Sequence, residues 1–325
     1  MKKIFFVPLV MLLLWSCDNE IDLNEEWKEI PVVYAIFNPV DTAQYVRLEK
    51  AFLDPNISAL EVAQIPDSIY FKDAQVFVKD FKTQKDYQFT LVDASKDGFP
   101  RDSGIFATTP NYLYKSKEFH PVPSEQYLFY ALKSNNNDTL TSAVFRIVDD
   151  LNLIRPHDNN YIINLRYINN FNILWEGGDE KGYYDVNIYF NYKEKNENNG
   201  GDWEYKTLKW KAGSKITETS YRIEGVRFYT FLRDHLTADP AIKRKFLYFD
   251  VEVISIGREL KEYIDILHAG SGITTSLQLP NYTNLSNGYG VVSSVNSVKL
   301  AGLLAGQLMR DSLRWGIYTK ELNFN

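Results

Sequence analysis

The chain has 325 residues, a formal net charge of −6 and a hydrophobic fraction of 45%. This length suits two domains, and this hydrophobic fraction excludes a chain that is disordered over most of its length. An acidic protein repels phosphate groups, and the sequence has no basic stripe, so nucleic acid is not expected as a partner. Aromatic residues reach 15%, with 22 Tyr and 20 Phe, and these residue types favour strands because they suit a pleated, half-buried surface.

Residues 1–16 have the pattern of a secretory signal peptide. Two lysines precede an apolar stretch over residues 4–14, which is shorter than the roughly 20 residues of a permanent membrane-spanning helix. The sequence LWSC, which ends at Cys17, resembles the lipobox of bacterial lipoproteins. The resemblance implies cleavage before Cys17 and attachment of palmitate-type chains to its thiol, and two or more chains give stable anchoring. An incidental cysteine after a plain signal peptide is the alternative, but a lone cysteine has no partner for a structural disulfide.

Residues 17–28 are expected to form an acidic tether, because they lack apolar periodicity. Asp18, Glu20 and Asp22 come just after the cysteine, and this arrangement resembles the signal that sends lipoproteins of Bacteroidota to the cell surface. A solvated tether whose acids have no such role is the alternative. Because the removed segment carries two lysines, the net charge is expected to change from −6 to −8 on processing.

Residues 29–148 are expected to form a first β domain. The apolar run at 29–37 ends at Asn38-Pro39, which predicts a buried strand and a turn. Further strands are predicted from alternation or turn signals, together with one short helix and a long polar loop. The predicted strand regions are 42–53, the hairpin 73–94, 126–134 and 139–148; the helix is 59–64 and the loop 93–111. Short strands separated by turns are typical of an antiparallel sandwich.

Residues 149–325 are expected to form a second β-rich domain, and the domain boundary is placed in the charged segment with Pro and Asn at 148–160. Its clearest strand alternates Tyr184, Val186, Ile188, Phe190 and Tyr192 on one face. A helix is predicted over 222–240, where helical apolar spacing ends at Pro240. The other predicted strands are 161–169, 171–178, 203–212, 245–256 and 313–324; 297–313 is predicted as a short helix, and 260–269 fits either a helix or a strand. The predicted fold class is therefore mainly β, with two antiparallel sandwich-like domains and one or two short helices in the second.

The order of these pieces resembles a family of uncharacterised Bacteroidota surface lipoproteins, a domain of unknown function. The resemblance rests on the lipobox, on the opening IPVVYAIFNPVDTAQYVRLEKAFL, on PSEQYLFYALKSNNNDTLTSAVFRIV and on the late LPNYTNLSNGYGVVSS. It implies an Ig- or fibronectin-like first domain and a second β-rich domain. Related lipoproteins sit beside outer-membrane barrels as external subunits. A set of tight turns is the alternative interpretation of the Asn/Gly-rich motif at 281–290.

No sequence pattern points to catalysis. The scattered histidines, without HxH or HExxH spacing, give no metal site, and no cofactor is expected; they are His120, His157, His235 and His268. His157-Asp158 near Asp149-Asp150 fits either a small oxygen-rich cation site or a solvated domain junction. The sequence contains no nucleophile elbow, phosphate-binding loop or dinucleotide fingerprint, so no catalytic residue is assigned and an enzyme is not expected.

Aromatic residues of the segment 203–210 are candidates for a ligand platform, since rings stack on the apolar faces of sugars. They are Trp203, Tyr205 and Trp210. Because seven residues separate the two tryptophans, they are expected on opposite faces of a regular strand, with at least one of them in the core.

Four Asp-Ser/Thr-apolar tripeptides match a pattern of O-glycosylation in Bacteroidota, with acceptors at Thr42, Ser68, Thr139 and Ser312. Together, these features predict a lipid-anchored lipoprotein of the outer membrane, displayed on the cell surface. Its expected role is a non-enzymatic accessory subunit of an outer-membrane barrel or transporter complex. Capture of glycan or peptide for a neighbouring transporter is the alternative.

Overall fold

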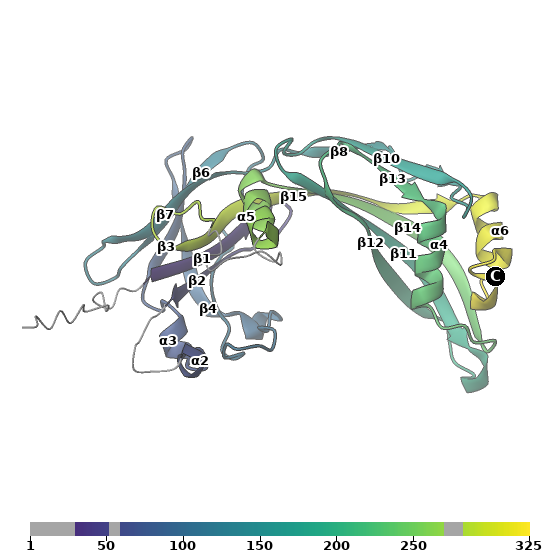
Figure 1. Cartoon of the computed structure of the whole chain (residues 1–325), viewed down its shortest axis with the longest axis horizontal. Helices are drawn as coiled ribbons and strands as arrows, with labels where there is room; N and C mark the ends of the chain where they lie inside the picture. The colour runs from purple at the N-terminus through teal and green to yellow at the C-terminus, as the bar shows by residue number, and fades with distance from the viewer. Residues whose placement is uncertain (1–29, 52–58, 270–281) are drawn as a thin grey trace, which may run out of the picture.

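A computed structural model describes residues 30–51, 59–269 and 282–325 (Figure 1). The protein is mainly β, which confirms the predicted fold class. Strands of the first half are β1 (Ile30–Phe37), β2 (Gln44–Ala51), β3 (Gln75–Asp80), β4 (Asp86–Asp93), β5 (Tyr112–Ser116), β6 (Gln126–Leu132) and β7 (Thr139–Arg146). Short helices α2 (Ala59–Val62) and α3 (Pro66–Ile69) and the 3₁₀ turn η2 (Ala94–Asp97) lie between them.

The second half has longer strands and longer helices. Its strands are β8 (Leu151–Arg155), β9 (Ile162–Ile163), β10 (Asn170–Gly177), β11 (Tyr183–Asn196), β12 (Glu204–Ile216), β13 (Ser220–Glu224), β14 (Ile242–Ile256) and β15 (Tyr289–Ala305). Its helices are α4 (Gly225–His235), α5 (Arg258–Ala269) and α6 (Gln307–Trp315), with 3₁₀ turns η3 (Glu197–Asn199) and η4 (Lys320–Leu322).

One long sheet runs through both halves, in the order β12-β11-β14-β15-β1-β2-β5-β4-β3-β6-β7. Strand β15 belongs to both parts of this sheet, and Figure 1 shows it crossing from one half to the other. Residues from Tyr289 to Ser294 pair in parallel with β1, and residues from Val295 to Leu303 pair antiparallel with β14. A continuous hydrogen-bonded ladder therefore joins the two halves.

Each half has its own hydrophobic core. The first core gathers side chains such as Phe37, Phe129 and Phe145, and it also includes Leu285 and Val292. The predicted second domain, 149–325, therefore does not lie in one core, because the segment before and at the start of β15 returns to the first. The second core gathers residues of β11, β14, α4 and α6 with those of the small sheet β13-β10-β8.

The side chains of β11 point alternately to the two faces of the sheet, as the period-two pattern of the sequence predicted. Tyr184, Val186, Ile188, Phe190 and Tyr192 all lie in the second core. Residues between them lie on the opposite side of the sheet, which we call the outer face. Cross-strand partners share a face in an antiparallel pair, so the outer face continues through the matching residues of β12 and β14.

Several predicted elements differ in the structure. The segment 297–313, predicted as a helix, continues β15 as far as Ala305 and becomes helical only in α6, because its apolar residues complete the sheet beside β14. The predicted strand 313–324 is the end of α6, a turn and η4, with only an isolated bridge between Arg244 and Phe324. The segment 260–269 is helical, in α5, and strands β5 and β8 were not predicted.

The Asn/Gly-rich motif closes the first half rather than forming only turns. Asn284 accepts a hydrogen bond from the Val292 amide and donates one to its carbonyl oxygen, at 3.0 and 2.7 Å. Ser286 hydrogen-bonds to the backbone of Ser142 in β7, and Asn287 donates to the Leu140 carbonyl. This segment therefore lies between β7, at one edge of the sheet, and the start of β15, and its hydrogen bonds cover that edge.

Candidate functional site

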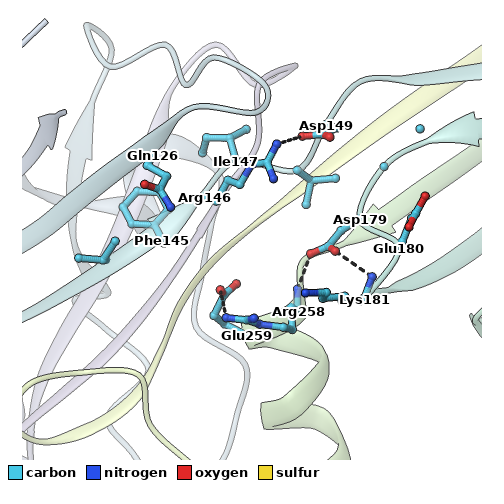
Figure 2. A pocket seen from close by; sticks show the side chains of 14 residues that line it. Gln126, Phe145, Arg146, Ile147, Asp149, Asp179, Glu180, Lys181, Arg258 and Glu259 are labelled. Carbon is cyan, nitrogen blue, oxygen red and sulfur yellow. Dashed lines mark hydrogen bonds and ion pairs between the residues drawn. The ribbon is translucent and has the colours of Figure 1, made fainter. Parts of the chain in front are cut away.

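A charged hollow lies at the junction of the two halves, with a volume of about 680 Å³ (Figure 2). It is lined by the end of β7, by the turn around Gly178 and by the start of α5. Arg146 pairs with Asp149 at 2.9 Å, and the Asp179 carboxylate accepts hydrogen bonds from the backbone amides of Lys181 and Arg258, each at 2.9 Å. The Asp149 carboxylate thus pairs with the last residue of β7, and the Asp179 carboxylate joins its turn to the start of α5.

The possible cation site near His157 is not assembled. His157 contacts Asp158 at 3.3 Å, whereas Asp149 is paired with Arg146 and Asp150 accepts from Asn296. No group of three or more His, Cys, Asp or Glu side chains among the described residues is placed to hold a metal ion. Of the two interpretations of this segment, the geometry favours the solvated junction.

A second hollow, of about 300 Å³, lies between α5 and the strands β1 and β15. We call it the tyrosine hollow, and it is lined by Tyr34, Tyr263, Tyr282, Tyr289, Ile266, Leu267 and Gly290. Tyr263 donates a hydrogen bond to the Tyr34 hydroxyl at 3.1 Å, and the two rings meet edge to face. Burial and this hydrogen bond raise the pKa of Tyr34, so its hydroxyl stays uncharged. The hollow combines aromatic surface with polar tips.

The three residues of the predicted aromatic platform lie in different environments. Trp210 is 9% exposed and packs against Phe228 and Phe231 in the second core, so it is removed from the platform. Tyr205 pairs across the sheet with Lys193 on the outer face and is 76% exposed. Trp203 lies beside the same strands, half-buried among lysine side chains. The two tryptophans thus lie on opposite faces of the sheet, as their odd spacing predicted.

Lysines of β11 and β14 surround Trp203. The ammonium groups of Lys193, Lys195 and Lys245 lie 5.1, 5.6 and 5.3 Å from its ring centroid. Lys193 is the cross-strand partner of Lys245, and Lys195 is that of Lys243. We call these four lysines and Trp203 the lysine–tryptophan patch. The sequence itself has no basic stripe, and the patch forms only in the folded chain, because strand pairing joins two short lysine pairs about fifty positions apart.

A second ring on the outer face is also in contact with lysines. Tyr189 lies 5.3 Å from the Lys209 ammonium and 4.1 Å from that of Lys299. Here the charge is balanced, because Lys299 pairs with Asp250 at 3.1 Å and Tyr189 donates to Glu252 at 2.7 Å. Burial and the hydrogen bond to Glu252 raise the pKa of Tyr189 to about 12.

The predicted glycosylation acceptors divide by exposure. Thr42 and Thr139 are exposed and Ser68 is partly exposed. Ser312 is 8% exposed, and its hydroxyl donates to the Leu308 carbonyl within α6. A glycosyltransferase cannot reach Ser312 in the folded protein, so the prediction of this acceptor was wrong.

The predicted lipid-attachment and export residues, Cys17, Asp18, Glu20 and Asp22, lie outside the described residues. Among the described helices, none combines the length and the apolar character needed to cross a membrane. No protein-family model matches the sequence, and a search of curated proteins finds no match. The resemblance to surface lipoproteins therefore stays a prediction.

Proposed function

We propose that the protein is a lipid-anchored lipoprotein of the outer membrane, displayed on the cell surface, where it acts as a non-enzymatic accessory subunit of an outer-membrane protein complex. The tyrosine hollow is the observation that carries this role. Tyrosine is enriched where proteins bind one another, because its ring buries apolar area and its hydroxyl finds a polar partner. Within the hollow, Leu267 is 57% exposed, Tyr289 43% and Tyr34 38%.

The position of the hollow along the chain also supports the proposal. Tyr34 lies in β1, the first described strand, and the predicted anchor Cys17 precedes this strand by a short segment. An extended chain spans at most about 3.6 Å per residue, so an anchored Cys17 would keep β1 within about 50 Å of the membrane surface. A partner embedded in the same membrane would then lie within reach of the tyrosine hollow.

A second candidate role, ligand capture for a neighbouring transporter, is favoured by Trp203 and Tyr205. Both contribute to the outer face, where Tyr205 is 76% exposed. This role is compatible with the first, because the two sites use different elements: the tyrosine hollow lies between α5, β1 and the start of β15, whereas Tyr205 lies in β12.

The decisive experiment for the subunit role is a mild-detergent pull-down from native membranes, followed by mass spectrometry. We expect the wild-type chain to recover an outer-membrane protein and Leu267→Glu to lose it, since a carboxylate in the tyrosine hollow opposes burial of apolar surface. Val122→Glu is the matched control, because Val122 is also an exposed aliphatic residue, at 51%. Recovery of no outer-membrane protein by the wild type would sink the subunit role.

Location has its own test. Cys17→Ala is expected to release the protein from membranes, because the lipid has no attachment site. Protease added to intact cells is expected to degrade the wild-type protein. Retention of the alanine variant would place the anchor elsewhere, and full protection would place the protein inside the cell envelope.

A further inference from the structure

The lysine–tryptophan patch concentrates positive charge on a protein that is acidic as a whole. Its lysines lie in two directly opposed pairs, Lys193 with Lys245 and Lys195 with Lys243. Like charges directly opposite each other destabilise a sheet. Adjacent strands are about 4.8 Å apart and alternate residues about 7 Å apart, so four ammonium groups project from an area close to that of one sugar ring.

These charges are mostly unneutralised. Among the ion pairs of the described residues, only Lys195 of the four lysines has a carboxylate within reach, Glu197 at 3.6 Å. Glu194 lies between Lys193 and Lys195 in sequence, but its side chain is on the core side of the sheet, where it pairs with Arg244 at 2.9 Å and Lys206 at 2.6 Å. The Glu194 carboxylate is therefore already engaged on the core side of the sheet.

The aromatic groups give the patch a second binding element. Trp203 lies among the lysine ammoniums, and Tyr205, the cross-strand partner of Lys193, extends the aromatic surface towards the edge of the sheet. Ring faces take up the apolar faces of sugars, and lysine ammoniums bind carboxylate or sulfate groups. The Tyr189 cluster has similar rings and lysines, but its acids balance its charge.

We propose that the lysine–tryptophan patch binds an acidic polysaccharide, with the sugar acid groups on Lys193, Lys195, Lys243 and Lys245 and a sugar ring against Trp203 and Tyr205. The inference specifies the ligand for the capture role proposed above and does not depend on the subunit role. Single-stranded nucleic acid is disfavoured, because its densely spaced phosphates extend beyond the patch towards an acidic protein surface. An anionic membrane is disfavoured, because the patch itself has no exposed aliphatic side chains to insert.

The test is affinity electrophoresis of the full-length protein in a mild non-ionic detergent. Gels contain alginate, dextran sulfate or uncharged dextran. We expect retardation by at least one of the two acidic polymers, none by dextran, and release by salt as the ion pairs are screened. Lys193→Glu/Lys245→Glu is expected to weaken binding at least tenfold, and Trp203→Ala to weaken it several-fold with all four lysines present.

Matched variants separate local recognition from net charge. Lys117→Glu/Lys133→Glu changes the net charge equally at exposed lysines of the first half, and it should bind the acidic polymer like the wild type. Circular dichroism of each variant checks the fold. Equal binding by both double variants would overturn the proposal, as would absence of binding to either acidic polymer. Stronger binding to a single-stranded oligonucleotide or to anionic lipid vesicles would also overturn it. Loss of polymer binding in the patch variant with normal pull-down would leave the subunit role intact.

Discussion

At the residue scale, two glycines that face β1 occupy demanding positions. Gly288 and Gly290 have φ values of +95° and +114°, and a Cβ added at them would lie 2.0 Å from the Pro31 carbonyl oxygen and 1.9 Å from that of Val33. Both lie in the Asn/Gly-rich motif. The motif therefore has a structural explanation, since its glycines permit close approach of the parallel strands and its amides bond to the neighbouring backbone.

Gly290→Ala is expected to destabilise the protein by about 2–4 kcal/mol, because it combines a strained backbone with a clash against the backbone of β1. Gly104→Ala is the control, since no atom lies within 4 Å of its added Cβ and its φ is not in the left-handed region. Urea unfolding measures both variants. Equal stability of the two would show that the β1–β15 contact can relax freely.

The buried pair of Glu194 and Arg244 predicts a dependence of stability on pH. Burial raises the pKa of the Glu194 carboxyl, but hydrogen bonds and charge from Lys206 and Arg244 outweigh it, so the pKa lies below its usual value of 4.5. The charged form is thus favoured by folding. Its contribution is fully present above about pH 4.5 and is lost as the pH falls through the folded-state pKa.

Glu194→Gln should therefore be less stable than the wild type at neutral pH, with a difference that shrinks as the pH falls below about 4.5. Denaturant titrations of both proteins from pH 7 to pH 3 measure this difference. The other carboxylates titrate in both proteins, so their contributions largely cancel in the difference in unfolding free energy between the two. A difference that stays constant over this range would show that Glu194 has an ordinary pKa.

At the element scale, side chains of β15 and the segment before it form hydrogen bonds with the backbone of β7 and of the residues that follow it. Ser294 is fully buried; it accepts a hydrogen bond from the Val148 amide and donates one to the Arg146 carbonyl, each at 2.9 Å. Asn296 donates to the carbonyls of Val148 and Asp149. Hydrogen bonds from side chains to the backbone thus take the place of some backbone–backbone hydrogen bonds at this edge of the sheet.

Ser294→Ala is expected to cost about 1–3 kcal/mol, because it leaves the buried Val148 amide without its partner and removes the bond to the Arg146 carbonyl. Ser297→Ala is the matched control, since the Ser297 hydroxyl is partly exposed and forms no hydrogen bond with the described residues. Thermal unfolding compares the two. If Ser297→Ala were equally destabilising, the hydrogen bonds of Ser294 would not explain the loss.

Sequence patterns predicted some strands correctly and assigned others to the wrong element. The period-two alternation of β11 placed Tyr184 to Tyr192 on the core face, because local pattern and burial agree there. The apolar run of β15 was partly assigned to a helix, because apolar runs fit buried helices and buried strands alike. The lysine–tryptophan patch could not be predicted, since it depends on which lysines of β11 and β14 become cross-strand partners.

At the scale of the whole molecule, β15 couples two cores that sequence reasoning treated as separate domains. One strand contributes Val292 to the first core and Leu303 to the second. Losing order in either half removes pairing partners from β15, so each half is expected to stabilise the other. Shared strands of this kind favour a common unfolding transition over independent ones.

The tryptophans allow this coupling to be tested. All those in the described residues, Trp175, Trp203, Trp210 and Trp315, belong to the second half. In the chain processed before Cys17, as proposed above, Trp27→Phe removes the remaining tryptophan. In that background Leu48→Ala, in the first core, should destabilise the first half by about 2–5 kcal/mol. We expect its urea midpoint to fall equally by tryptophan fluorescence and by circular dichroism.

Leu60→Ala, at a position 62% exposed, is the control. If the fluorescence midpoint stayed at the wild-type value while circular dichroism moved, the halves would unfold independently and β15 would be a connector without energetic coupling.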